Sequence, residues 1–134
     1  MAKRESIIQA EILLAISAGF HWLGLRAWRQ NAGTARSMDG SRTIKLAPKG
    51  ASDIVGSFRG RMIAPEVKQP GKSLRREQSD FRREMIAAGA LPFVWTSAEQ
   101  AVEELIQAFD LEEHRAEIET RARKPLAARK KKGC

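Results

Sequence analysis

Asp53, Glu66 and Lys68 form the combination of residue types and spacing that points most directly to chemistry. They lie on two consecutive runs with the alternating composition of strands, and the turn between the runs predicts a β-hairpin. A turn centred between Arg59 and Gly60 places Asp53 opposite Glu66, with Cβ atoms roughly 4.5–5.5 Å apart. Lys68 lies two residues beyond Glu66 and shares its face. The hairpin therefore predicts two acids and a lysine on one face of a sheet.

The chemistry of this trio depends on what holds two carboxylates together. Two carboxylates at such a distance repel each other unless a cation lies between them. Oxygen ligands without histidine or cysteine suit Mg²⁺ or Mn²⁺ rather than zinc. A lysine beside the metal can hold an attacking water and offset the negative charge that develops on a phosphate. The trio therefore predicts phosphodiester hydrolysis, and a surface salt bridge between Lys68 and its acidic neighbours is the alternative.

Gln78 lies on the apolar stripe of a helix that is expected to start at Ser73 and to run to about Ala88. The rest of the stripe consists of Leu74, Phe81, Met85 and Ala88 at helical spacing. A buried amide must find hydrogen-bonding partners. Gln78 is therefore expected to aim its amide at the acidic face of the sheet or, alternatively, to bond to backbone at the edge of the stripe. The flanks of this helix carry either a phosphate track or a solvated face, made of Arg75, Arg76, Arg82 and Arg83.

The elements that position these residues follow from the hydrophobic pattern and from the turn residues. We expect helices at 5–18, 73–88 and 98–109, the last continuing beyond a break near Asp110, and strands at 25–30, 42–47, 53–58, 61–68 and 91–97. Residues 34–41 are polar and predict a loop. The order α-β-β-β-β-α-β-α predicts an α/β fold with a central mixed sheet flanked by helices. Pro65, directly before Glu66, removes a ladder donor and predicts a bulge or a one-sided pairing there.

The basic charge of the chain is concentrated at its C-terminus. The 134 residues carry a net charge of +8, and residues 121–134 alone hold seven bases and no acid. Such a segment is not expected to bury apolar surface, so we predict one domain over 1–120 and a disordered basic tail over 121–134. Its Lys130, Lys131 and Lys132 are candidate contacts to polyphosphate without sequence preference. A solubilising terminus without a partner is the alternative.

The compartment is predicted from one apolar run and one cysteine. The run IIQAEILLAI is too short to span a bilayer and contains Gln9 and Glu11, so it predicts a helix rather than a signal peptide. A single cysteine, Cys134, gives no disulfide framework, which is typical of a reducing compartment. These features predict a cytoplasmic protein that does not act at a membrane.

Several stretches resemble the virus-type replication-repair nuclease domain (VRR-NUC), a branch of the PD-(D/E)xK restriction-endonuclease-like superfamily. They are ESIIQ from Glu5, WRQNAG at 28–33, KGASDIVG at 49–56, EVK at 66–68 and SLRREQSDF at 73–81. The stretch AAGALPFVWTSAEQAVEEL is similar to the closing strand and helix of the family. A D…ExK core alone is weak evidence, so the resemblance depends on the order and spacing of the stretches and on the downstream glutamine.

The resemblance implies a restriction-endonuclease-like fold and metal-dependent hydrolysis of DNA phosphodiester bonds. It implies that Asp53 and Glu66 bind Mg²⁺ or Mn²⁺, with the Val67 carbonyl as a further ligand. Lys68 would be the catalytic lysine.

Further site residues come from the same resemblance. Gln78 would orient the site, and a glutamate of the first helix would complete it. Glu5 matches the family pattern, whereas Glu11 points about 120° around the helix from it. Arg29 and Asn31 are candidate DNA contacts.

The resemblance also implies the class of substrate and the assembly. Members of the superfamily that cut branched or double-stranded DNA often work as dimers, so we expect a homodimer that acts on DNA in replication, repair or recombination, of phage or bacterial origin. Two other classes of protein remain as alternatives. One is a non-catalytic nucleic-acid-binding protein that uses the basic tail, and the other is a structural interaction protein.

Overall fold

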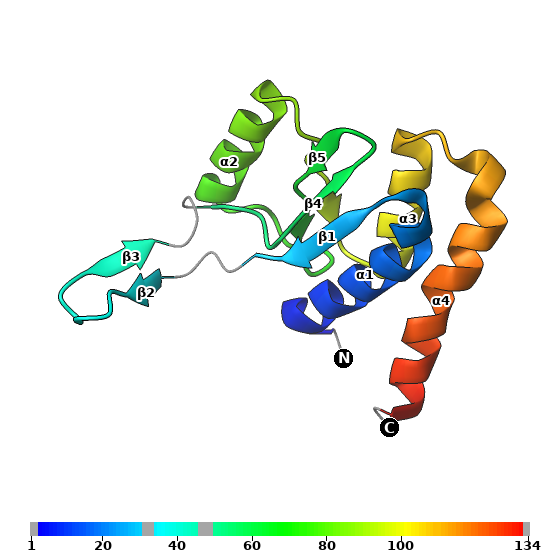
Figure 1. The fold of residues 1–134 in the computed structure, drawn as a ribbon, viewed down its shortest axis with the longest axis horizontal. Helices are drawn as coiled ribbons and strands as arrows, with labels where there is room; N and C mark the ends of the chain where they lie inside the picture. The colour runs from blue at the N-terminus through cyan, green and yellow to red at the C-terminus, as the bar shows by residue number, and fades with distance from the viewer. Residues whose placement is uncertain (1–2, 31–33, 46–49, 133–134) are drawn as a thin grey trace.

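Four helices and seven short strands make up the described part of the chain, residues 3–30, 34–45 and 50–132, in this computed structural model (Figure 1). The helices are α1 (Glu5–Phe20), α2 (Arg76–Ala87), α3 (Ala98–Ala108) and α4 (Arg115–Lys132), with 3₁₀ turns at His21–Leu23 and Glu112–His114. The strands are β1 (Arg26–Arg29), β2 (Thr34–Arg36), β3 (Thr43–Lys45), β4 (Ile54–Phe58), β5 (Arg61–Ile63), β6 (Glu66–Val67) and β7 (Val94–Trp95). The predicted mixed α/β class is confirmed.

The predicted hairpin is formed by β4 and β5. The two strands run antiparallel to each other, and β1 pairs antiparallel with the other edge of β4. Gly56 lies opposite Ile63 and Phe58 opposite Arg61, which is the register that the turn at Arg59 and Gly60 predicts. The ladder ends before Asp53, however, so Asp53 is not a strand partner of Glu66 as we expected.

The chain changes partners at Pro65. The N–H of Ala64 donates to the Leu91 carbonyl at 3.0 Å, and the N–H of Glu66 donates to the Phe93 carbonyl at 2.7 Å. Both acceptors lie in the segment that leads into β7, which pairs parallel to β6. Proline has no N–H. Pro65 lies between Ala64 and Glu66, whose N–H groups both face the segment of Leu91 and Phe93, so the missing donor of Pro65 is on the other side. The predicted one-sided pairing is confirmed, and it divides the expected strand 61–68 into β5 and β6.

The core lies between the sheet and the helices α1, α3 and α4. Its buried side chains come from all of these elements and include Ile12, Ile16, Phe20, Ile54, Phe58, Ile63, Val67, Leu105, Ile106 and Ile118. Helix α2 lies apart from this layer, at the opposite side of the view from α4 (Figure 1). None of the described core residues comes from α2, so the core is formed without this helix.

Helix α1 is longer than the apolar run in the sequence. Together with the following 3₁₀ turn, Glu5–Leu23 is long and apolar enough to cross a membrane by length and composition. This is weak evidence, because the core helix of a soluble protein passes the same test. In this structure α1 buries Ile8, Ile12 and Ile16 in the core.

The C-terminal segment forms a helix, which corrects the prediction of a disordered tail. Helix α4 extends through Lys132 and packs along α1 (Figure 1). Ile118 and Ala122 are buried, and Leu126 packs against the same cluster, so an apolar residue recurs every four positions among the bases. Gly19 of α1 allows this approach, because a Cβ there would lie 3.2 Å from the Cβ of Ala122. The net composition of residues 121–134 concealed this stripe.

Two further local predictions are wrong. Helix α2 begins at Arg76 rather than after a cap at Ser73, and its first turn is closed by the Arg75 N–H, which donates to Gln78 Oε1 at 2.9 Å. The expected loop 34–41 contains β2, which pairs with β3 to form a hairpin that stands out from the body (Figure 1). The break near Asp110 is confirmed, since Asp110 has a φ of 54° between α3 and α4.

Candidate active site

Three charged or polar side chains are buried together where β6 and α2 meet. Glu66 is 5% exposed, Lys68 7% and Gln78 5%. Acids and lysines are almost never buried to this extent unless they are paired. The alternative of a solvated surface salt bridge is therefore incompatible with the structure.

Gln78 connects the helix to the acid. Its Nε2 donates to Glu66 Oε1 at 2.9 Å, and its Oε1 accepts the backbone N–H of Arg75 at 2.9 Å. The amide is thus held at both ends, and it fixes the orientation of the Glu66 carboxylate. The prediction that α2 aims this amide towards the acidic face is confirmed.

Asp53 lies directly before β4 and acts on Glu66. The pKa of Glu66 is raised from 4.5 to about 8, first by burial and then by the charge of Asp53 and a hydrogen bond with it. Lys68 lowers this pKa and Glu5 raises it. Four ionisable groups from separate parts of the chain therefore share one electrostatic site.

One oxygen of this site has no partner. Asp53 Oδ2 is buried without a hydrogen-bond partner among the described residues. A buried carboxylate oxygen left in this state costs about 1–3 kcal/mol or more. A cation between Asp53 and Glu66 would satisfy this oxygen and would also favour the ionised form of Glu66, against the effects of burial and of the Asp53 charge.

The direction of the Val67 carbonyl, which the resemblance implies as a further ligand, follows from the backbone pairing of β6. The N–H groups of Glu66 and Lys68 donate to β7, to the carbonyls of Phe93 at 2.7 Å and Trp95 at 3.0 Å. Backbone polar groups of successive strand residues face opposite edges. The carbonyl of Val67 therefore faces the other edge of β6, away from β7.

These oxygens are the ligands that the structure offers to a divalent cation. Two carboxylates and a backbone carbonyl suit Mg²⁺ or Mn²⁺ by their hardness. Within residues 3–30, 34–45 and 50–132, no group of three or more His, Cys, Asp or Glu side chains is placed to hold a metal. A cation held by Asp53 and Glu66 would therefore need further ligands from main chain or solvent.

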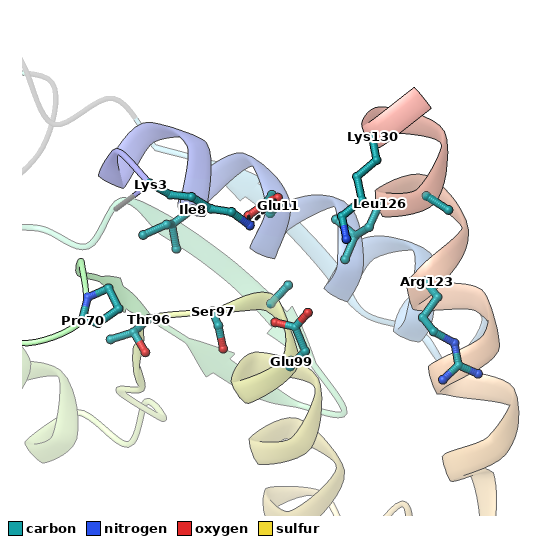
Figure 2. Close-up of a pocket in the computed structure, with 12 residues that line it drawn as sticks. Lys3, Ile8, Glu11, Pro70, Thr96, Ser97, Glu99, Arg123, Leu126 and Lys130 are labelled. Carbon is teal, nitrogen blue, oxygen red and sulfur yellow. Dashed lines mark hydrogen bonds and ion pairs between the residues drawn. The ribbon is translucent and has the colours of Figure 1, made fainter. Parts of the chain in front are cut away.

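Glu5 and Glu11 have different surroundings. Glu5 is in the first turn of α1 and is close enough to Glu66 to raise its pKa. Glu11 forms an ion pair with Lys3, at 2.9 Å, and lines a cavity of about 490 Å³ next to α4 (Figure 2). Glu5 is thus the glutamate of α1 that belongs to the site.

The arginines predicted on the flanks of α2 lie outside the buried cluster. The four side chains are exposed on the surface of the helix or just before it, and they are Arg75, Arg76, Arg82 and Arg83. Arg83 forms an ion pair with Asp80. Their position fits either a phosphate track or a solvated face.

The remaining predicted DNA contacts are spread over two elements. Arg29 is exposed at the end of β1, next to the site in the sheet. Lys130 and Lys131 are exposed near the C-terminal end of α4. Asn31 lies outside the described residues, and so does the side chain of Lys132.

Gly50 is a site residue that the sequence analysis missed. Its φ is +80°, and a Cβ there would lie 2.1 Å from the carbonyl oxygen of Glu77. The loop that leads to Asp53 therefore rests directly on the first turn of α2, next to Gln78. No spacing in the sequence reports this contact, although the glycine itself is part of the KGASDIVG stretch.

Replacing Gly50 by alanine is expected to lower the free energy of unfolding by about 3 kcal/mol, from backbone strain and from the clash with α2. Gly71 is the matched control, because its φ is +84° but nothing lies within 4 Å of its added Cβ. Gly71→Ala should cost only about 1 kcal/mol. Urea denaturation of both variants measures the difference, and equal losses would contradict the contact between this loop and α2.

Comparison with known proteins adds no assignment. No family model matches the chain, and no curated protein or solved structure matches it. The function must therefore be inferred from the geometry of the site.

Proposed function

We propose that the protein is a metal-dependent DNA endonuclease that hydrolyses phosphodiester bonds, with a restriction-endonuclease-like fold of the VRR-NUC kind. The observation that carries the proposal is the buried cluster of Glu66, Lys68 and Gln78 beside the unpartnered Asp53 oxygen. A buried lysine and two coupled acids are expensive to maintain for stability alone. A strongly raised pKa such as that of Glu66 is typical of functional sites.

The order of the elements supports the same fold. Asp53 directly precedes β4 and Glu66 begins β6; β4 pairs antiparallel with β1 and β5, and β6 pairs parallel with β7. Helix α2, which carries Gln78, connects β6 to β7. These pairings include antiparallel and parallel strands, as in a mixed sheet, but they form separate small sheets, and β3 pairs with β2 outside them.

Each residue of the site has a distinct part in the proposed hydrolysis. Asp53, Glu66 and the Val67 carbonyl would hold Mg²⁺ or Mn²⁺, which supplies Lewis-acid polarisation of a phosphate and a more acidic water when bound. Lys68 holds the attacking water and stabilises the negative charge that develops on the phosphoryl oxygens. Gln78 keeps the Glu66 carboxylate in one orientation.

The proposed DNA contacts surround this site on several elements. The exposed arginines of α2 and Arg29 of β1 would bind phosphates next to the cluster, and the basic end of α4 would add binding without sequence preference. We include a homodimer in the proposal, because a chain with one such site needs a second copy to cut both strands of a branched or double-stranded DNA.

The proposal is tested by incubating the protein with supercoiled plasmid and with a four-way junction in Mg²⁺, in Mn²⁺ and in EDTA. Cleavage is expected with either metal and not with EDTA. Asp53→Ala removes the unpartnered ligand and should lower the cleavage rate by about 10²–10³-fold or more. The proposal of a nuclease would be overturned if no metal-dependent cutting occurred at any protein concentration. It would also be overturned if the Asp53→Ala variant were as active as the parent.

A non-catalytic nucleic-acid-binding protein is the second candidate. The exposed bases near the end of α4 favour it, since they can bind phosphates without any help from the cluster. Binding alone, however, gains nothing from two acids beside the bound phosphates. In that case the plasmid would be retarded in a gel but left intact under every metal condition.

A further inference from the structure

A second cavity lies beside the carboxylate cluster, between α1, the end of β1 and the C-terminal half of α4. Its volume is about 500 Å³, within the range of pockets that hold small ligands. Most of its wall is apolar and includes Leu13, Leu14, Ile54 and Pro125. Its only charged lining residues, within the part of the chain that the structure describes, are Arg29 and Arg129.

The positive charge of this cavity favours an anionic ligand. Two guanidinium groups with no acid among the described lining residues favour a phosphate or a carboxylate, because arginine binds these groups in a bidentate manner. The neighbouring cavity of Figure 2 differs, since Glu11 and Glu99 line it together with its bases. An anionic ligand with an apolar portion thus fits the charge and the lining of the cavity with Arg29 and Arg129.

Gln9 provides an independent sign of a ligand. It lines the cavity, it is only 8% exposed, and its Oε1 is buried without a hydrogen-bond partner among the described residues. Leaving a buried amide oxygen unpaired costs about 1–3 kcal/mol. A ligand that brings an N–H group to this wall would remove that cost.

The cavity adjoins the proposed active site on two elements. Ile54 follows Asp53 directly and pairs with Arg29 in the sheet. Gln9 lies one helical turn beyond Glu5 on α1, and residues at this spacing have Cβ atoms about 5–6 Å apart. The cavity and the carboxylates are therefore neighbours along the chain at β4 and along α1.

We propose that the cavity binds one unpaired nucleotide of the DNA strand next to the phosphate that is cut. Its phosphate lies between Arg29 and Arg129, its base lies against the apolar wall, and an exocyclic or ring N–H of the base donates to Gln9. This inference deepens the proposed function, since it assigns a substrate with a single-stranded segment to the same site. A paired base cannot enter without leaving its stack.

The first test measures binding in EDTA, so that it does not depend on cleavage. Arg29→Gln and Arg129→Gln should each weaken the binding of a short fluorescein-labelled single strand by about tenfold, the equivalent of one charge-assisted contact. Arg123→Gln is the matched control, because Arg123 is exposed on α4 but lines the other cavity. It should weaken binding no more than about twofold through general charge. Equal losses in all three variants would overturn the proposal.

The second test locates the nucleotide. Deoxyadenosine monophosphate, added to the full chain in EDTA, should shift the side-chain amide resonances of Gln9, and 2-deoxyribose 5-phosphate should shift them less. Leu14→Trp, a larger side chain at a half-exposed position of the wall, should abolish the shifts. Unchanged Gln9 resonances, or the same shifts with Leu14→Trp, would overturn the nucleotide site.

The two proposals fail in different ways. If plasmid is never cut but the binding differences hold, the protein is not a nuclease and the cavity is still a nucleotide site. If metal-dependent cleavage is found while Arg29→Gln and Arg129→Gln bind like Arg123→Gln, the nuclease stands and the cavity proposal is wrong.

Discussion

Lys68→Met is expected to lower the rate of DNA cleavage by about 10²–10³-fold and to leave DNA binding within a few-fold. Methionine has nearly the same length and fills the buried space, so the variant removes the charge without opening a cavity. The loss has two causes. The developing charge on the phosphate loses its positive partner, and the pKa of Glu66 rises further because Lys68 is the group that lowers it.

Lys72→Met is the control for this variant. Lys72 is exposed in the loop between β6 and α2, so the same change in charge occurs close to the site but outside the buried cluster. Its cleavage rate should stay within about twofold of the parent, as for most exposed charges. Plasmid nicking in Mg²⁺, with binding measured separately in EDTA, distinguishes the two positions. If Lys68→Met cut DNA as fast as Lys72→Met, Lys68 would have no part in the reaction.

The hairpin and its polar contact could be predicted because they depend on local rules. The turn at Arg59 and Gly60 fixes the register of β4 and β5, and the spacing of apolar residues on α2 aims Gln78 at the sheet. Pro65 predicts the change of pairing, because a missing N–H can be tolerated only on an unpaired side. Each of these inferences needs only a few consecutive residues and one periodicity.

The features that could not be predicted depend on contacts between distant segments. The helix α4 is polar in composition. Its apolar stripe is buried only because α1 packs beside it, with Gly19 allowing the close approach. The contact of Gly50 with the first turn of α2 has no local signal either. The cavities beside α4 follow from the same packing, so the sequence could not reveal them. Tertiary packing decides these cases rather than propensity.

The ionised form of Glu66 destabilises the folded protein, and a bound cation would reduce this destabilisation. In the protein without metal, burial and the neighbouring Asp53 oppose the ionised form of Glu66. The carboxyl therefore keeps its proton at a pH where an exposed glutamate is ionised. The folded chain then carries a destabilising acid, which a cation bound beside Glu66 would stabilise in its ionised form.

Without metal, the free energy of unfolding is expected to fall as the pH rises from about 5 to 8 and to level off above that. The pKa of Glu66 is raised from 4.5 to about 8 in the folded chain, so between these values the folded state binds more protons than the unfolded state. Stability is then present at low pH and is lost as the pH passes through the folded pKa. The total loss should be on the order of 2–4 kcal/mol, measured by urea denaturation in EDTA.

Glu66→Gln provides the decisive comparison, because the amide keeps an oxygen for Gln78 Nε2 and has no proton to lose in this range. The free energy of unfolding of Glu66→Gln should change little between pH 5 and 8, because residue 66 no longer titrates. At pH 8 it should exceed that of the parent, although cleavage is lost.

Adding Mg²⁺ should stabilise the parent at pH 8 more than at pH 5, since the ionised carboxylates bind the cation. Glu66→Gln should gain much less from Mg²⁺. Parallel pH profiles for the two proteins in EDTA would mean that Glu66 is ionised throughout, and an equal gain from Mg²⁺ would place the cation elsewhere.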